Sequence, residues 1–177
     1  NIAGLAASKG DVPYGYPGVC YNCSIIGTDY FDLKNLNNLM ELSKKGAKVI
    51  NASFGMKHYY ETAQEMINEI YNNGTIIVAA SHNPSWEDNH GQDYYYPASY
   101  DNVISVSGVM HRYNKPLDNL QYQKSGSPYA HNVKYYLGSS LGFIDRDITK
   151  DVRIYPISIA TLNTKVDILA PSVGLFL

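Results

Sequence analysis

The sequence has no apolar run close to the roughly 18 residues that a membrane-spanning helix requires. Charged residues make up only 17% of the 177 residues and the formal net charge is −2, so the composition predicts neither a nucleic-acid partner nor an anionic membrane partner. The sequence also contains no internal repeat and no low-complexity tract. The 177 residues, of which 45% are hydrophobic, are enough to form one globular domain with a sizeable core.

A signal peptide is also absent, and the first residue is Asn1 rather than methionine. The sequence is therefore expected to be a processed product or a piece of a longer chain.

Cysteine is scarce, with Cys20 and Cys23 forming a single C-x-x-C. One such pair falls short of the four ligands that zinc usually needs, and it leads into Ile25 and Ile26 instead of opening a helix as a thioredoxin-type pair would. Two interpretations remain open. The pair forms a short-loop disulfide, which would fit an extracellular protein, or it remains as two reduced thiols at the entrance to a strand.

Segments of helical periodicity alternate with short, unbroken apolar segments along the chain. Asp32 is expected to cap one helix, and Gly46 and Gly74 stand where helices should stop. Apolar strands that alternate with helices predict an α/β fold in three layers, with a mostly parallel central sheet covered on both faces. Helices are predicted over Ile2–Ser8, Asp32–Lys45 and Glu61–Tyr71, and strands over Ser24–Thr28, Ala47–Ala52, Thr75–Ala80, Val103–Val109 and Lys165–Ala170.

The pattern dissolves between about residues 111 and 163, where Tyr, Asn, Ser and Gly mix with short apolar pieces. We interpret this stretch as an elaborated loop or an added β-hairpin region within a single domain that spans residues 1–177.

Ligands of parallel α/β sheets bind beyond the carboxyl ends of the strands. The segments that follow those ends here are rich in small or polar residues, namely Ser53-Phe54-Gly55, Ser81-His82-Asn83 and Pro171-Ser172. The sequence therefore predicts that any functional site lies at this edge of the sheet.

Five blocks of the sequence, in order, resemble motifs of the subtilisin-like serine peptidases, or subtilases. The blocks are AGLAAS at 3–8, KVINASFG at 48–55, GTIIVAASHN at 74–83, YPASYDNVISVSGV at 96–109 and VDILAPS at 166–172. The corresponding family segments are the end of H-G-T-H-V-A-G-x-x-A, then V-I-N-x-S-L-G, G-x-x-V-V-A-A-A-G-N, Y-P-A-S-Y-x-N-V-I-S-V-G-A-V and V-D-I-x-A-P-G. The resemblance spans nearly the whole chain except residues 111–163. It implies the central portion of a subtilase peptidase domain, with a subtilisin-like fold that is incomplete in this chain.

The resemblance assigns roles to individual residues. Asn83 matches the asparagine whose side-chain amide donates a hydrogen bond to the oxyanion of the tetrahedral intermediate. Ser53, Phe54 and Gly55 match the strand edge that binds the substrate backbone. The wall of the pocket for the side chain preceding the scissile bond is matched by Ala79, Ala80 and Ser81.

The chain departs from the family pattern next to Asn83 and near its end. Histidine stands at position 82 in place of glycine, and is expected to narrow the pocket or alter the loop. Pro84 restricts Asn83 to extended geometry. Ser172 replaces the glycine of the last block.

The resemblance also implies that the catalytic triad lies outside this chain. No D-T/S-G motif occurs, the alignment places the catalytic histidine three residues before Asn1, and the G-T-S-M-A-x-P serine motif is expected beyond Leu177. We expect the chain alone to be inactive.

No cofactor is required by this chemistry, but calcium is possible. The backbone carbonyls of Ala98, Tyr100 and Val103 match a weak cation site in some relatives. The loop with Glu87, Asp88 and Asp93 around His90 is either an oxygen-rich cation site or simply a solvated acidic loop, the more ordinary interpretation. Apart from these candidate residues, the sequence predicts no metal site.

Two hypotheses about function follow. The chain is part of a secreted or cell-surface serine endopeptidase that hydrolyses peptide bonds, or it is a non-catalytic subtilase-like module that acts as a binding or structural subunit of a larger assembly. The expected partners are a polypeptide substrate and the remaining segments or chains of the same peptidase domain. Leaving off the helix that carries the nucleophile should expose an apolar face of several hundred Å².

Overall fold

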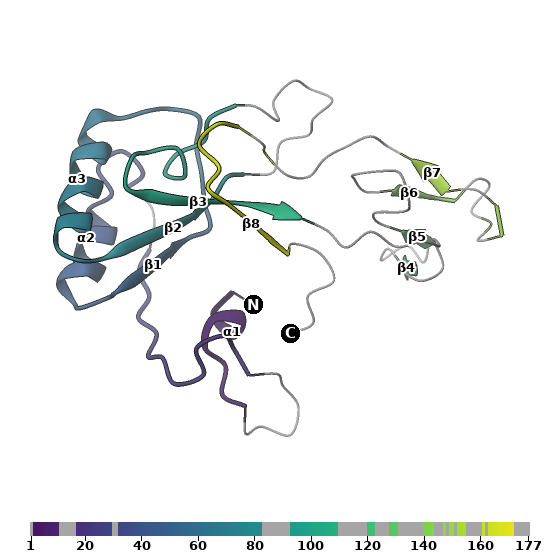
Figure 1. The fold of residues 1–177 in the computed structure, drawn as a ribbon, viewed down its shortest axis with the longest axis horizontal. Helices are drawn as coiled ribbons and strands as arrows, with labels where there is room; N and C mark the ends of the chain where they lie inside the picture. Colours follow the sequence, from purple (N-terminus) through teal and green to yellow (C-terminus); the bar gives the residue numbers. More distant parts are fainter. Residues whose placement is uncertain are drawn as a thin grey trace.

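A computed structural model describes the fold (Figure 1). The described residues are 2–10, 17–29, 32–82, 93–109 and 163–171, with shorter pieces at 120–122, 128–130, 140–143, 147, 149–150, 152–154 and 161.

Four parallel strands form the central sheet in the order β1-β2-β3-β8. They are β1 (Val49–Ala52), β2 (Ile76–Ala80), β3 (Val103–Val109) and β8 (Ile168–Pro171). Because all four are parallel, their carboxyl ends lie at one edge of the sheet. The predicted α/β class with a parallel central sheet is confirmed.

Two helices, α2 (Asn37–Lys44) and α3 (Glu61–Asn72), pack against each other and against one face of the sheet. Alternate strand residues turn toward them. The resulting core consists mainly of aliphatic side chains from both layers, among them Leu39, Met40, Leu42, Ile50, Ala52, Ala63, Ile67, Ile70, Ile77 and Ala79.

The opposite face of the sheet is apolar and largely uncovered in the described part of the chain. Val49 and Ile76 are paired across β1 and β2 and are 61% and 43% exposed. Ile168, opposite Val106, is 52% exposed. The short helix α1 (Ile2–Ala7), which agrees with its predicted span, contains no buried residue. The described residues therefore cover one face of the sheet, which is consistent with an incomplete subtilisin-like fold.

The prediction that the second helix starts at Asp32 is wrong by about one turn. The Asp32 carboxylate accepts a hydrogen bond from the Asn35 N–H at 3.1 Å, and the Asp32 carbonyl accepts one from the Leu36 N–H. These bonds close a separate turn, and Leu36 then takes a left-handed conformation (φ 55) that interrupts the helical path. The predicted stops at Gly46 and Gly74 are confirmed, since both glycines have positive φ.

Two predicted strands also differ. No strand forms over Ser24–Thr28, and Ile25 and Ile26 are exposed, since this segment pairs with none of the described strands. The last strand starts at Ile168 rather than Lys165. The Asn163 side-chain oxygen accepts a hydrogen bond from the Lys165 N–H, and the Asn163 backbone carbonyl accepts one from the Val166 N–H. These two bonds form a turn before the strand.

Two small antiparallel sheets occur within residues 111–163 and lie apart from the parallel sheet (Figure 1). One pairs β4 (Leu120–Tyr122) with β5 (Pro128–Ala130), and the other pairs β6 (Ser140–Phe143) with β7 (Val152–Ile154). Antiparallel pairing agrees with the predicted β-hairpin region, whereas the limits of the insertion stay a prediction.

Candidate functional site at the carboxyl ends of the strands

The segments that follow β1 and β2 lie side by side, because Ala52 pairs with Ala79 at the end of the parallel ladder. Ser53-Phe54-Gly55 leaves the first strand, and Ser81-His82 leaves the second. The sheet thus brings together the two segments that the sequence singled out. Asn83, Pro84 and Ser172 lie outside the described residues, so the oxyanion role of Asn83 stays a prediction.

The chain continues beyond β1 in an extended form with alternating sides. Ala52 is fully buried, Ser53 is exposed and Phe54 packs against the core. Met56 then exchanges two backbone hydrogen bonds with Tyr96, at 2.9 and 2.8 Å. Within the described residues, no backbone–backbone hydrogen bond outside the regular elements involves Ser53 or Gly55. An extended peptide could therefore pair with this edge.

The three predicted pocket-wall residues differ in burial. Ala79 and Ser81 are 1% and 2% exposed and belong to the interior, whereas the Ala80 side chain reaches the surface. Their backbone can border a pocket, but only Ala80 can offer a side chain to a ligand.

His82 has a left-handed backbone conformation (φ 81), which residues other than glycine rarely adopt. Its ring stacks on the ring of Tyr95, with the centroids 4.2 Å apart and the planes at 23°. A Cβ atom added to Gly55 would lie 3.0 Å from His82 Cδ2. The imidazole therefore rests directly against Gly55, next to the extended edge.

A buried threonine fixes the His82 backbone. Thr161 has no exposed surface, and its hydroxyl donates to the His82 carbonyl at 3.1 Å. The Thr161 carbonyl in turn accepts a hydrogen bond of 2.6 Å from the Ser107 hydroxyl on β3. Sequence reasoning missed Thr161, because it belongs to the 111–163 region, which has no periodic pattern.

Tyr95 and Lys57 were also missed. The Lys57 ammonium lies 5.6 Å from the centroid of the Tyr95 ring and 2.7 Å from an Asp93 carboxylate oxygen. This hydrogen bond to Asp93 raises the pKa of Lys57. Tyr95 could have been noticed in the sequence, since it directly precedes the YPASY block. The ion pair between residues 57 and 93 has no sequence signal.

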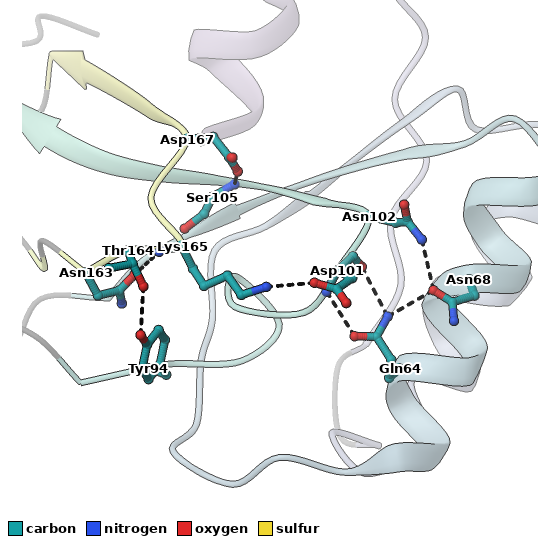
Figure 2. Close-up of polar contacts among 10 residues, drawn as sticks. All are labelled: Gln64, Asn68, Tyr94, Asp101, Asn102, Ser105, Asn163, Thr164, Lys165 and Asp167. Atoms are coloured by element: carbon teal, nitrogen blue, oxygen red, sulfur yellow. Dashed lines mark hydrogen bonds and ion pairs between the residues drawn. The ribbon is translucent and has the colours of Figure 1, made fainter.

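A polar network holds the Tyr94–Asn102 segment between α3 and the turn before β8 (Figure 2). Gln64 of α3 accepts a hydrogen bond from the Asp101 N–H at 2.9 Å and donates one to the Asp101 carbonyl at 3.2 Å. On the other side, the Lys165 ammonium contacts the Asp101 carboxylate at 2.7 Å and the Tyr94 hydroxyl bonds to the Thr164 hydroxyl at 2.7 Å. The network fixes the segment that carries Tyr95.

Of the candidate calcium ligands, Ala98 and Tyr100 are buried residues of this same segment, and Val103 is the buried first residue of β3. Among the described residues, no group of three or more His, Cys, Asp or Glu side chains could hold a metal ion. Lys165 already brings a positive charge to Asp101, and that hydrogen bond raises the pKa of Lys165. Calcium at the three carbonyls stays a prediction, as does a cation in the acidic loop, most of which lies outside the described residues.

Cys20 and Cys23 are joined by a disulfide, which resolves the two interpretations of the C-x-x-C in favour of the bridge. In the part of the chain that the structure describes, no helix is long and apolar enough to cross a membrane.

Comparison with known proteins agrees with this fold. A thermophilic serine proteinase of Bacillus sp. (strain AK1) is 30% identical over 116 residues, which cover 62% of this chain and 28% of the relative. Thermitase of Thermoactinomyces vulgaris is 29% identical over 122 residues, covering 65% of this chain and 42% of the relative. The chain thus spans less than half the length of these relatives.

Solved structures of proteases also resemble the fold of this chain. A protease of Pseudoalteromonas arctica matches with a TM-score of 0.51 and 25% identity, over 61% of this chain and 36% of that chain. Fervidolysin of Fervidobacterium pennivorans matches with a TM-score of 0.50 and 25% identity, over 73% of this chain and 19% of that chain. The sequence model of the subtilase family matches residues 1–173. The parallel sheet, the ordered sequence blocks and this match together show that the chain belongs to the subtilase family.

Proposed function

We propose that this chain is part of a secreted subtilisin-like serine endopeptidase and supplies its substrate-binding segments and its oxyanion donor. The observation that carries this proposal is the extended Ser53-Phe54-Gly55 edge, which lies beside the end of β2 with the main chain of Ser53 and Gly55 unused by neighbouring described residues. Fold membership alone does not give an activity, so the proposal rests on this site.

A peptide substrate would bind as an additional strand along Ser53–Gly55. Main-chain hydrogen bonds would hold it, and the wall formed by residues 79–81 would border the side chain that precedes the scissile bond. Binding in this register would present one carbonyl to the position that follows His82, where the sequence continues to Asn83.

Asn83 would act when a serine attacks that carbonyl. Negative charge then develops on the carbonyl oxygen, and a preorganised amide N–H can stabilise it by about 3 kcal/mol. The aspartate, histidine and serine of the triad would come from sequence outside residues 1–177. The reaction requires no cofactor. Calcium at the carbonyls of Ala98, Tyr100 and Val103 would add stability to the segment that carries Tyr95.

The uncovered sheet face supports the need for those further segments. Val49, Ile76 and Ile168 lie on a face of a parallel sheet, and such faces are normally covered by helices. We propose that the remaining segments of the same peptidase domain cover it.

Secretion is supported by two observations. The Cys20–Cys23 disulfide is stable in oxidising compartments, and matched proteins of Serratia marcescens are named extracellular serine proteases.

A second candidate is a non-catalytic subtilase-like module that binds peptides or assembles with other chains. The contact between the His82 ring and Gly55 favours it, because that ring reduces the room for a substrate side chain.

Substitution of Asn83 separates the two candidates. In the full-length protein, Asn83→Ala should lower kcat for peptide hydrolysis by about 10²–10³-fold with little change in KM, because the lost hydrogen bond forms only in the transition state. Asn72→Ala, at the exposed end of α3, is the matched control and should leave kcat unchanged. Hydrolysis that is unaffected by Asn83→Ala would refute the oxyanion role, and a full-length protein that hydrolyses no peptide would favour the non-catalytic module.

A further inference from the structure

We infer that His82 determines substrate specificity by restricting the residue that precedes the scissile bond to a small side chain. The inference rests on the proposed function, because it concerns the same binding edge. It goes further by naming the substrate class, which is peptides with Gly, Ala or Ser at that position.

The His82 ring lies directly beside the binding edge. Phe54 packs against the core, and the side-chain direction of the neighbouring Gly55 is already occupied, since an added Cβ would lie 3.5 Å from the Tyr96 carbonyl oxygen and 3.8 Å from Tyr95 Cβ. The His82 ring lies against Gly55 in that direction, close enough that even an added methyl group would crowd it at 3.0 Å. The Tyr95 ring stacks on the imidazole, with the ring centroids 4.2 Å apart. The imidazole thus occupies the space between the ends of β1 and β2.

Several contacts hold the ring in place. The Thr161 hydroxyl binds the His82 carbonyl, and the preceding Ser81 N–H donates to the Val106 carbonyl at 2.9 Å. The stacking partner is itself fixed, because Tyr95 is 6% exposed and its neighbour Tyr96 pairs with Met56. A large substrate side chain could enter only by displacing the imidazole and losing the stack.

These contacts have a direct consequence for a bound peptide. Its main chain would run along Ser53–Gly55, and the side chain that faces Gly55 would meet the imidazole within van der Waals distance. We therefore expect hydrogen, methyl and hydroxymethyl side chains to be accepted beside the ring, and leucine and phenylalanine to be excluded. A mismatch of even one methylene in such a pocket changes kcat/KM by about tenfold or more.

The test compares kcat/KM of the full-length protein for two peptides that differ only in having Ala or Phe before the scissile bond. The wild type should prefer Ala, and both His82→Gly and His82→Ala should raise the ratio of Phe to Ala cleavage at least about tenfold. Using both variants separates loss of the ring from the backbone effect of glycine. His58→Ala removes an exposed histidine next to Tyr60 and should not change the ratio.

Two other outcomes overturn the inference in distinguishable ways. If the wild type cleaves both peptides and neither His82 variant changes the ratio, His82 does not determine specificity, while the proposed function stands. If the wild type cleaves no peptide of any sequence, the proposed function is wrong, and the specificity role that rests on it is wrong as well.

Discussion

His82 combines an unfavourable backbone conformation with favourable side-chain contacts. At φ 81 its Cβ is crowded by its own backbone, which costs a non-glycine residue roughly 1–2 kcal/mol. The stack on Tyr95 and the hydrogen bond from Thr161 offset part of that cost. A strained residue that the surroundings hold in place is common at functional sites, which agrees with a role at the binding edge.

Two substitutions at this position separate the backbone strain from the ring contacts. Both His82→Gly and His82→Ala remove the imidazole, but only glycine relieves the strain. We expect His82→Gly to be the more stable of the two by about 1 kcal/mol in urea unfolding of the full-length protein. Equal stabilities would show that the residue does not keep its left-handed conformation.

At the scale of elements, the Tyr94–Asn102 segment depends on α3 more than on its surface ion pair. Gln64 is buried and satisfies both backbone groups of Asp101 (Figure 2), whereas the Lys165 and Asp101 side chains are 46% and 74% exposed. An unsatisfied buried polar group costs more than a lost surface ion pair. The site wall that carries Tyr95 is therefore positioned chiefly by the helix.

We expect Gln64→Ala to lower the free energy of unfolding by about 1–3 kcal/mol, because it leaves the Asp101 N–H and carbonyl without partners. Lys165→Ala should cost less than about 1 kcal/mol, and Glu65→Ala, on the exposed side of α3, should change stability by under about 0.5 kcal/mol. Thermal or urea unfolding of the three variants checks this order. A Gln64 variant as stable as the Lys165 variant would contradict it.

The elements that periodicity predicted well are those whose partners lie in the described part of the chain. The spans of α3 and β3 follow from their apolar spacing, since Ile67, Ile70 and Val103 all reach the shared core. The predicted strand over Ser24–Thr28 does not form, because a strand needs a neighbouring strand and the local sequence does not reveal whether one is present. At the site, the order of motifs pointed to Ser53–Gly55 and His82. The contacts of Tyr95 and Thr161 depend on tertiary packing, and Thr161 in addition has no motif beside it in the sequence.

At the scale of the whole molecule, the described residues form half of a layered fold. One sheet face is covered by α2 and α3 (Figure 1), and the other exposes apolar side chains on β1, β2 and β8. The chain likewise carries one side of the proposed site, namely the binding edge and the residue before Asn83. Both observations agree with the proposal that further segments of a peptidase domain complete this fold and this site.

The measurement that tests this account most directly is labelling of the full-length protein with a serine-directed fluorophosphonate, followed by identification of the modified residue by mass spectrometry. We predict a single labelled serine outside residues 1–177, and no labelling of a protein restricted to residues 1–177. A full-length protein that is not labelled, or a label on a serine within this chain, would contradict the account.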